Sequence, residues 1–392
     1  MSTYRRAWMF IGLALFFLYV VYRGANRGSD FKYPYYAAQA LWRTHQFHVR
    51  AQPRYPISFH VLLAPIAALP LWLASAVWAA LSMVAVATLP KVIQALSGLS
   101  FREQGPIWLF SLPFLIDALV LGQSDPINLA LVLWSLVALE QGWLLVAAGM
   151  VGLAGMIKIL PIFHWATLIA RTRHWQLWLG IALTILFGIG IVVAGAGTSD
   201  ALLAARQQFN WLSQRERPWH LLERGADLRV NNESLPIALA RTMGRIEPRP
   251  PLHALSLDLL SFETIWWVWS GMILSLVVGW LACAWAVRKN HSTRALLALG
   301  SLTSILMLAC TPICWHHYFL WLLPSLTYFG DRRKLLWSGG GFSLVVSALP
   351  VARGMGLHMM IALLLYTLIT IDVLKQAQRE GDADSSCSRT FG

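Results

Sequence analysis

Charged residues are scarce in this chain of 392 residues, in which Asp, Glu, Lys and Arg together make up 12%. A soluble domain carries about twice that share. Hydrophobic residues make up 57%, so the composition excludes water as the main solvent of the folded chain. A basic domain is also lacking, because the Lys and Arg residues behind the net charge of +13 lie in short clusters between apolar runs. This distribution argues against nucleic acid and favours anionic lipid headgroups and phosphate-bearing substrates as partners.

Cysteine is rare as well, with Cys283, Cys310, Cys314 and Cys387 the four in the chain. Their spacing matches no zinc or redox motif, and we expect no structural disulfide. No internal repeat is evident either. This lack argues mildly against a secondary transporter, because many transporters are built from two repeats.

The sequence is rich in apolar runs with a length of about 20 residues, which is what a membrane helix needs. They predict an all-α, polytopic membrane protein with about twelve spans in one domain over residues 1–375, followed by a disordered cytoplasmic tail over residues 376–392. The spans lie near residues 7–22, 57–70, 72–90, 106–122, 125–139, 142–170, 174–197, 264–287, 294–311, 314–329, 335–350 and 355–374. The first is kept as an anchor, because no small-x-small cleavage site follows it.

Clusters of Lys and Arg give the predicted orientation. If the N-terminus is cytoplasmic, five clusters lie on the cytoplasmic side, as the positive-inside rule requires. They are Arg5 and Arg6; Arg171 and Arg173; Arg288 and Lys289; Arg332, Arg333 and Lys334; and Lys375 and Arg379. Two external loops are then residues 23–56 and 198–263. The first is basic against the rule, either to bind an anion or as ordinary surface charge.

Three polar stretches converge on the external side in this topology: Asp30, residues 231–234, and the His316-His317-Tyr318 triplet. Asp30 follows the first span directly, where low-dielectric surroundings favour a role as a base. Capping of a short interfacial helix over residues 33–46 is the alternative for this residue.

His317 stands at the external mouth of a span, where it is a candidate to donate a hydrogen bond to a phosphate oxygen or to hold an acceptor sugar. The alternative is an interfacial side chain without a chemical role. His316 has the weaker case, because adjacent helical residues point about 100° apart and do not readily face one pocket.

Lys158 lies inside a long apolar run, where a charge costs roughly 3 kcal/mol to insert. It is a candidate to neutralise a phosphate leaving group. The alternatives are snorkelling towards the interface and a structural pair with Asp117 or another buried acid. Pro161, three residues later, is expected to break the helix.

Gln123, Tyr318 and Asn232 are further candidates for contact with substrate. Gln123 is the one residue of Gly122–Pro126 to which we give a role, because a turn between two spans explains the others. Asn232 has two alternatives: a loop cap, with Asn231 beside it, or the first residue of the glycosylation acceptor pattern Asn-Glu-Ser, which has a high false-positive rate.

The order of several short motifs resembles glycosyltransferase family 87, the polytopic C-type enzymes that include polyprenol-phosphate-mannose-dependent α-mannosyltransferases. No single motif is specific, but the ordered series covers most of the chain. It consists of Ser29-Asp30-Phe31 with Tyr35-Tyr36-Ala37-Ala38, Tyr55-Pro56 leading into Leu63-Ala64-Pro65, Gly122-Gln123 with Pro126, Lys158 with Pro161, Asn232-Glu233-Ser234-Leu235, and Thr311-Pro312 with Trp315-His316-His317-Tyr318. The chain departs from the common pattern at Cys314, where serine is usual, and at His316, which precedes the expected histidine.

The resemblance implies an inverting transfer of a hexose, most often mannose, from a polyprenyl-phosphate carrier to a hydroxyl of a lipid or glycan acceptor outside the cytoplasm. It also implies a plasma (inner) membrane location. Asp30 would serve as the base, and Lys158 and His317 would bind the donor phosphate. No Asp-x-Asp pair lies in the external loops, so we expect no cofactor and no metal. A transporter or flippase of a lipid-linked or anionic solute is the main alternative, and a non-catalytic partner in envelope assembly is another.

Overall fold

The computed structural model describes residues 3–26, 30–44, 55–215, 232–244, 257, 259–288, 290, 292–311 and 313–390. These residues form helices joined by short turns. No strand occurs among them, and their β-type pairing is confined to two isolated bridges, Asn232 with Trp315 and Gly244 with Leu260. The predicted all-α class is confirmed.

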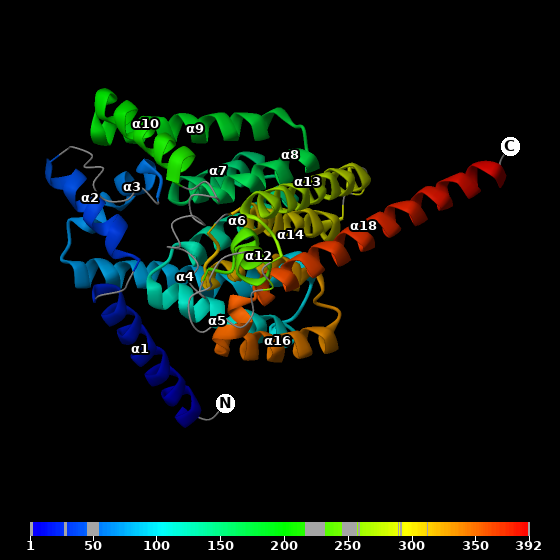
Figure 1. Ribbon diagram of the computed structural model, residues 1–392, viewed down its shortest axis with the longest axis horizontal. Helices are drawn as coiled ribbons and strands as arrows, with labels where there is room; N and C mark the ends of the chain where they lie inside the picture. The colour runs from blue at the N-terminus through cyan, green and yellow to red at the C-terminus, as the bar shows by residue number, and fades with distance from the viewer. Residues whose placement is uncertain are drawn as a thin grey trace.

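The helices follow one another in a bundle from which α1 and α18 project (Figure 1). With η for 3₁₀ helices, they are α1 (Thr3–Ala25), α2 (Lys32–Thr44), α3 (Ile57–Ala67), α4 (Leu71–Ser97), α5 (Gly105–Leu121), α6 (Asp125–Glu140), α7 (Leu144–Ile157), η1 (Leu160–Phe163), α8 (His164–Arg171), α9 (Trp175–Ala196), α10 (Thr198–Arg215), α12 (Leu235–Met243), α13 (Phe262–Val287), α14 (Thr293–Cys310), η3 (His316–Leu322), α15 (Leu323–Tyr328), α16 (Arg333–Ala348), α17 (Pro350–Gly354) and α18 (Leu357–Thr390).

Several helices have the length and composition of membrane spans. Five of the described helices qualify in full, namely α4, α9, α13, α14 and the Leu357–Glu380 part of α18, and four shorter apolar helices accompany them. The most apolar 18-residue window of α14 is 83% buried, whereas that of α13 is 11% buried. Helices such as α13 therefore turn apolar side chains outward, as a protein dissolved in lipid does. The predicted number of about twelve spans is not confirmed.

The run predicted as one span over residues 142–170 is divided. Helix α7 ends at Ile157, Lys158 is extended, and the chain resumes as η1 and then α8. Pro161 accounts for the break, because proline lacks the N–H that would bond to the carbonyl of Ile157 and its ring clashes with that carbonyl. The predicted span over residues 314–329 is likewise a 3₁₀ helix, η3, followed by the short α15.

The C-terminal tail differs from the prediction. Residues 376–390 are helical, because α18 continues without interruption to Thr390, and Figure 1 shows this helix extending beyond the bundle. The expected disorder was wrong for the backbone of these residues. The stretch Lys375–Glu380 contains no proline or glycine and is rich in good helix formers, so nothing in it ends the helix.

One end of the bundle holds a connected set of polar contacts. Arg171 contacts Glu140 and donates to the carbonyl of Asn290, whose side chain donates to Glu380. Close by, Arg294 forms ion pairs with Asp331 and Asp372, at 3.6 and 3.3 Å. The turns after α8, α13 and α15 and the later part of α18 therefore meet at one end of the bundle.

Candidate functional site

Asp30 is fixed against the end of α5. Its backbone N–H donates to the carbonyl of Leu121 at 3.0 Å, and its Oδ2 accepts a hydrogen bond from Nε2 of Gln123. Gln123 in turn accepts from the hydroxyl of Tyr55 at 3.2 Å. The structure thus brings together two predicted site residues, Asp30 and Gln123, and adds a tyrosine.

An aromatic cluster holds this segment in place. Phe31 is 1% exposed and stacks on Trp78 with ring centroids 5.7 Å apart, while Trp78 also contacts Phe59. The indole of Trp78 donates to the carbonyl of Gly122 at 2.9 Å. Apolar burial of Phe31 therefore sets the position of the neighbouring Asp30, which remains only half-buried.

Gly122 ends α5 in the left-handed region, with φ 68° and ψ 33°. Glycine adopts this conformation without steric cost. The sharp turn that results puts Gln123 beside Asp30 and lets Asp125 begin α6 in the buried interior, two residues later.

Lys158 and Asp125 form a buried ion pair. The Nζ atom lies 2.9 and 3.0 Å from the two carboxylate oxygens, and the indole of Trp321 donates to the same carboxylate at 2.9 Å. The ammonium also lies 3.8 Å from the ring centroid of Tyr318, a cation–π contact. Of the alternatives for Lys158, a pair with a buried acid is what the structure contains, and the acid is Asp125 rather than Asp117.

His317 lies between two acids. Its side chain is 1% exposed, with Nδ1 3.6 Å from Asp117 and Nε2 3.8 Å from Asp125. Neither distance is a hydrogen bond, and neither ring nitrogen has a hydrogen-bond partner among the described residues.

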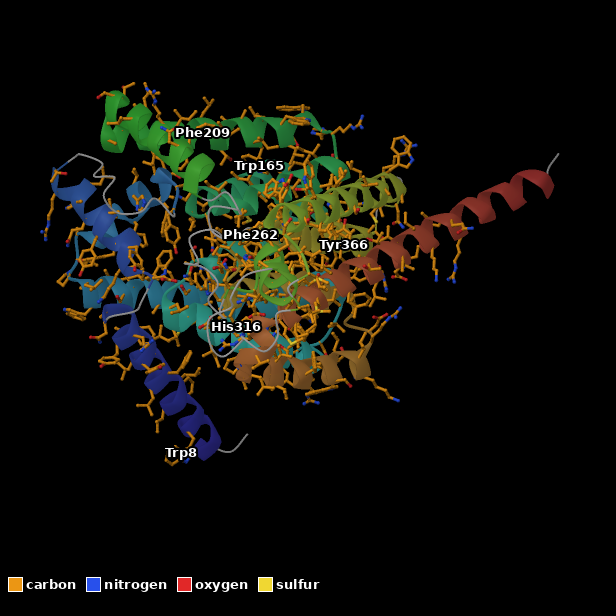
Figure 2. The ribbon with its side chains drawn as sticks, in the orientation of Figure 1. Trp8, Trp165, Phe209, Phe262, His316 and Tyr366 are labelled. Carbon is orange, nitrogen blue, oxygen red and sulfur yellow. The ribbon has the colours of Figure 1, made fainter. Side chains whose placement is uncertain are left out.

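His316 also reaches Asp117, at 3.5 Å from Nδ1. Asp117 is thus in contact with both rings at the start of η3. Their Nε2 atoms do diverge, that of His316 towards the hydroxyl of Ser347 at 3.0 Å. Figure 2 shows His316 well inside the outline of the molecule, in contrast to Trp8 on α1.

Asn232 holds the loop before α12 against the segment before η3. Its Oδ1 accepts from the backbone N–H groups of Cys314 and Ser234, and its carbonyl accepts from Arg241. Burial lowers the pKa of Arg241 to about 10, which leaves it charged at neutral pH. Asn232 is itself 0% exposed, so the loop-cap alternative describes its contacts. Asn231, Ser29 and Pro312 lie outside the described residues.

Several site residues were missed by sequence reasoning. Asp125 was assigned to a turn, although an acid flanked by apolar runs could have been matched with the intramembrane Lys158. Glu233 and His358, 125 residues apart, share a hydrogen bond of 2.7 Å. The sequence feature that points to His358 is its position as an ionisable residue within a predicted span.

Tyr55 connects the two halves of the site. Burial raises the pKa of its phenol and the charge of Lys158 opposes this, while Asp30 and Asp125 act in the same direction as burial. The hydroxyl therefore stays protonated and donates to Gln123. The site as a whole offers a carboxylate held by an amide on one side, and a cation paired with an acid on the other. This combination suits removal of a proton at one point and stabilisation of negative charge at another.

The comparisons with known proteins identify a family. No curated protein and no solved structure matches the chain. A family model described as Glycosyltransferase family 87 matches residues 54–312, which include Tyr55, Gln123, Asp125 and Lys158 but neither Asp30 nor His317. Because this match extends over more than half of the sequence, the chain belongs to glycosyltransferase family 87.

Proposed function

We propose that this glycosyltransferase moves a hexose, mannose in the first instance, from a polyprenyl-phosphate carrier to an acceptor hydroxyl on the extracytoplasmic side of the plasma membrane. The acceptor oxygen attacks the anomeric carbon from the face opposite the phosphate, with inversion. Its proton passes to Asp30, and the bond between the anomeric carbon and the phosphate oxygen breaks with its electron pair on the phosphate.

The observation that carries the proposal is the attachment of Asp30. One carboxylate oxygen is bonded to Gln123, and the backbone is bonded to the end of α5. A base needs a fixed position within hydrogen-bond reach of the proton that it accepts. The half-buried Asp30 combines that fixed position with access for a substrate.

Charge on the other side of Tyr55 supports a phosphate site there. Lys158 and His317 both lie within 4 Å of Asp125, so a donor phosphate that approaches them takes the place of an existing anionic partner. Tyr318 lies under the ammonium, and Gln123 bridges towards Asp30. In this scheme the residues themselves compensate the charge of the leaving phosphate, and the transfer step uses no metal ion.

The test is transfer of labelled hexose from a polyprenyl-phosphate donor to a membrane lipid extract by the purified chain. Asp30→Asn keeps the size of the side chain and its contact with Gln123 but removes the base. We expect at least about a 100-fold loss of rate, the usual contribution of general base catalysis. Brief exposure to a chelator during the assay should leave the rate unchanged.

Asp331→Asn is the matched control, because it makes the same chemical change at a side chain that is 59% exposed and paired with Arg294. Its rate should equal that of the unchanged chain. Equal rates for Asp30→Asn and Asp331→Asn would remove Asp30 as the base. No transfer from any polyprenyl-phosphate hexose by the folded protein would reject the donor class.

A further inference from the structure

Three segments that are distant in the sequence bring metal-binding side chains together. Glu233 precedes α12, His316 opens η3, and His358 is the second residue of α18. One donor atom from each lies within 4.8 Å of the others. All three residues are buried, with exposures of 0, 7 and 0%.

The carboxylate of Glu233 is incompletely satisfied. Its Oε2 lies 2.7 Å from Nδ1 of His358, while its Oε1 is buried and has no hydrogen-bond partner among the described residues. A buried anion with an open coordination position is costly unless a cation or donor meets it. This orphan oxygen is a second observation that points to a ligand beside the three side chains.

The contacts of the two rings assign their tautomers. His316 presents Nδ1 to the carboxylate of Asp117, and His358 presents Nδ1 to that of Glu233. A neutral ring that donates from Nδ1 keeps a lone pair on Nε2. Both Nε2 atoms face the hydroxyl of Ser347, at 3.0 and 3.4 Å. One hydroxyl hydrogen can satisfy only one of these two lone pairs.

A metal ion would satisfy both the unpaired oxygen of Glu233 and the ring nitrogen that the Ser347 hydroxyl leaves without a donor. His316 would bind the ion through Nε2 and keep its Nδ1–H towards the carboxylate of Asp117, as metal-binding histidines typically do. His358 would bind it through Nδ1, beside Glu233, and turn its Nε2–H towards the hydroxyl of Ser347. An aromatic wall limits water, with Phe114 4.8 Å from the His316 ring and 4.9 Å from the His358 ring between centroids. A divalent ion would also add positive charge beside the carboxylates of Asp117 and Glu233, the second of which already interacts with the charge of Arg241.

We propose that Glu233, His316 and His358 bind one zinc ion, with a water as fourth ligand. Two imidazoles and a carboxylate are a ligand set that zinc favours. Bonds of about 2.1 Å place tetrahedral ligands about 3.4 Å apart, so the side chains close by little more than 1 Å. The ion joins the loop before α12, η3 and α18, and its role is to hold these segments together. It takes no part in the proposed transfer step.

The experiment measures metal content and uses no sugar donor, so its failure is distinct from failure of the proposed function. The full chain, carrying no polyhistidine tag, is purified in detergent from zinc-supplemented cells and analysed by mass spectrometry of its metals. We expect about one zinc per chain, and at least about tenfold less in Glu233→Gln and in His358→Gln. His174→Gln, a change at an exposed histidine, should retain the zinc.

Cobalt(II) gives a second readout. Metal-free protein titrated with cobalt should develop the visible bands of a four-coordinate site, and His316→Gln should lack them. Gel filtration identifies any variant that fails to fold. If the variants do not fold, the zinc content of the unchanged chain alone tests the proposal. The proposal is overturned if the unchanged chain neither contains zinc nor binds cobalt, or if the folded Glu233→Gln and His358→Gln variants keep their zinc.

Discussion

Among single residues, Asp125 and Lys158 depend most on each other. Lys158 has no second acid in ion-pair contact among the described residues, and the other ring or cation near Asp125 in such a contact is His317, at 3.8 Å. Both side chains of the pair are buried. Loss of one partner of such a pair costs about 3–5 kcal/mol, because the remaining charge is left without compensation.

We therefore predict that Asp125→Asn and Lys158→Met each lower the free energy of unfolding by about 3–5 kcal/mol, while the double variant loses less than either one alone. Denaturation in detergent, followed by tryptophan fluorescence, measures this. Asp331→Asn, which breaks a solvent-exposed pair, should change stability by no more than about 1 kcal/mol. Additive losses in the double variant would contradict the coupling.

The sequence indicated some of these residues and concealed others. Asp30, Gln123, Lys158 and His317 were found because polar side chains next to apolar runs need an explanation. Asp125 was not, because Gly-Gln-Ser-Asp-Pro satisfies every rule for a turn and the same acid serves equally well as a helix start. The contact of His358 with Glu233 depends on how α18 packs, which no local pattern encodes.

Among the elements, the turn between α5 and α6 has the greatest influence on the site. Its single left-handed residue, Gly122, comes before Gln123, which contacts Asp30, and before Asp125, which contacts Lys158. A change in the conformation of this turn therefore alters the position of Gln123 and the position of Asp125 together.

Gly122→Ala should reduce the transfer rate by at least about tenfold while costing about 1–2 kcal/mol of stability, because alanine is strained at φ 68°. Gly98→Ala is the matched control: Gly98 also ends a helix, at φ 74°, with nothing within 4 Å of an added Cβ. It should lose similar stability and keep its activity. Equal activities in the two variants would show that the turn does not set the site.

Helix boundaries were largely predictable, and the exceptions have physical causes. The span predicted over residues 264–287 corresponds to α13, Phe262–Val287. An uninterrupted apolar run determines both ends of such a helix closely. The division at Lys158 follows from Pro161, whose effect was expected although the span was drawn as continuous. The 3₁₀ form of η3 was not predictable, because its backbone is set by contacts with α5 and α6.

On the scale of the whole molecule, the orientation in the membrane is open to direct measurement. We predict that Arg43→Cys reacts with an impermeant thiol reagent in intact cells and that Asp331→Cys reacts only after permeabilisation. Both positions are exposed. The background carries Cys387→Ser to remove one native thiol. The opposite labelling pattern would invert the topology and place Asp30 on the cytoplasmic side.

The Lys158–Asp125 pair also bears on how the chain enters the membrane. Each charge alone opposes insertion by roughly 3 kcal/mol. However, Asp125 begins α6 and Lys158 directly follows α7, and these consecutive helices pack against each other. A helical hairpin can therefore enter the bilayer with its acid and its base already joined and nearly neutral. Biogenesis of this buried ion pair does not have to wait for the later segments that eventually surround it.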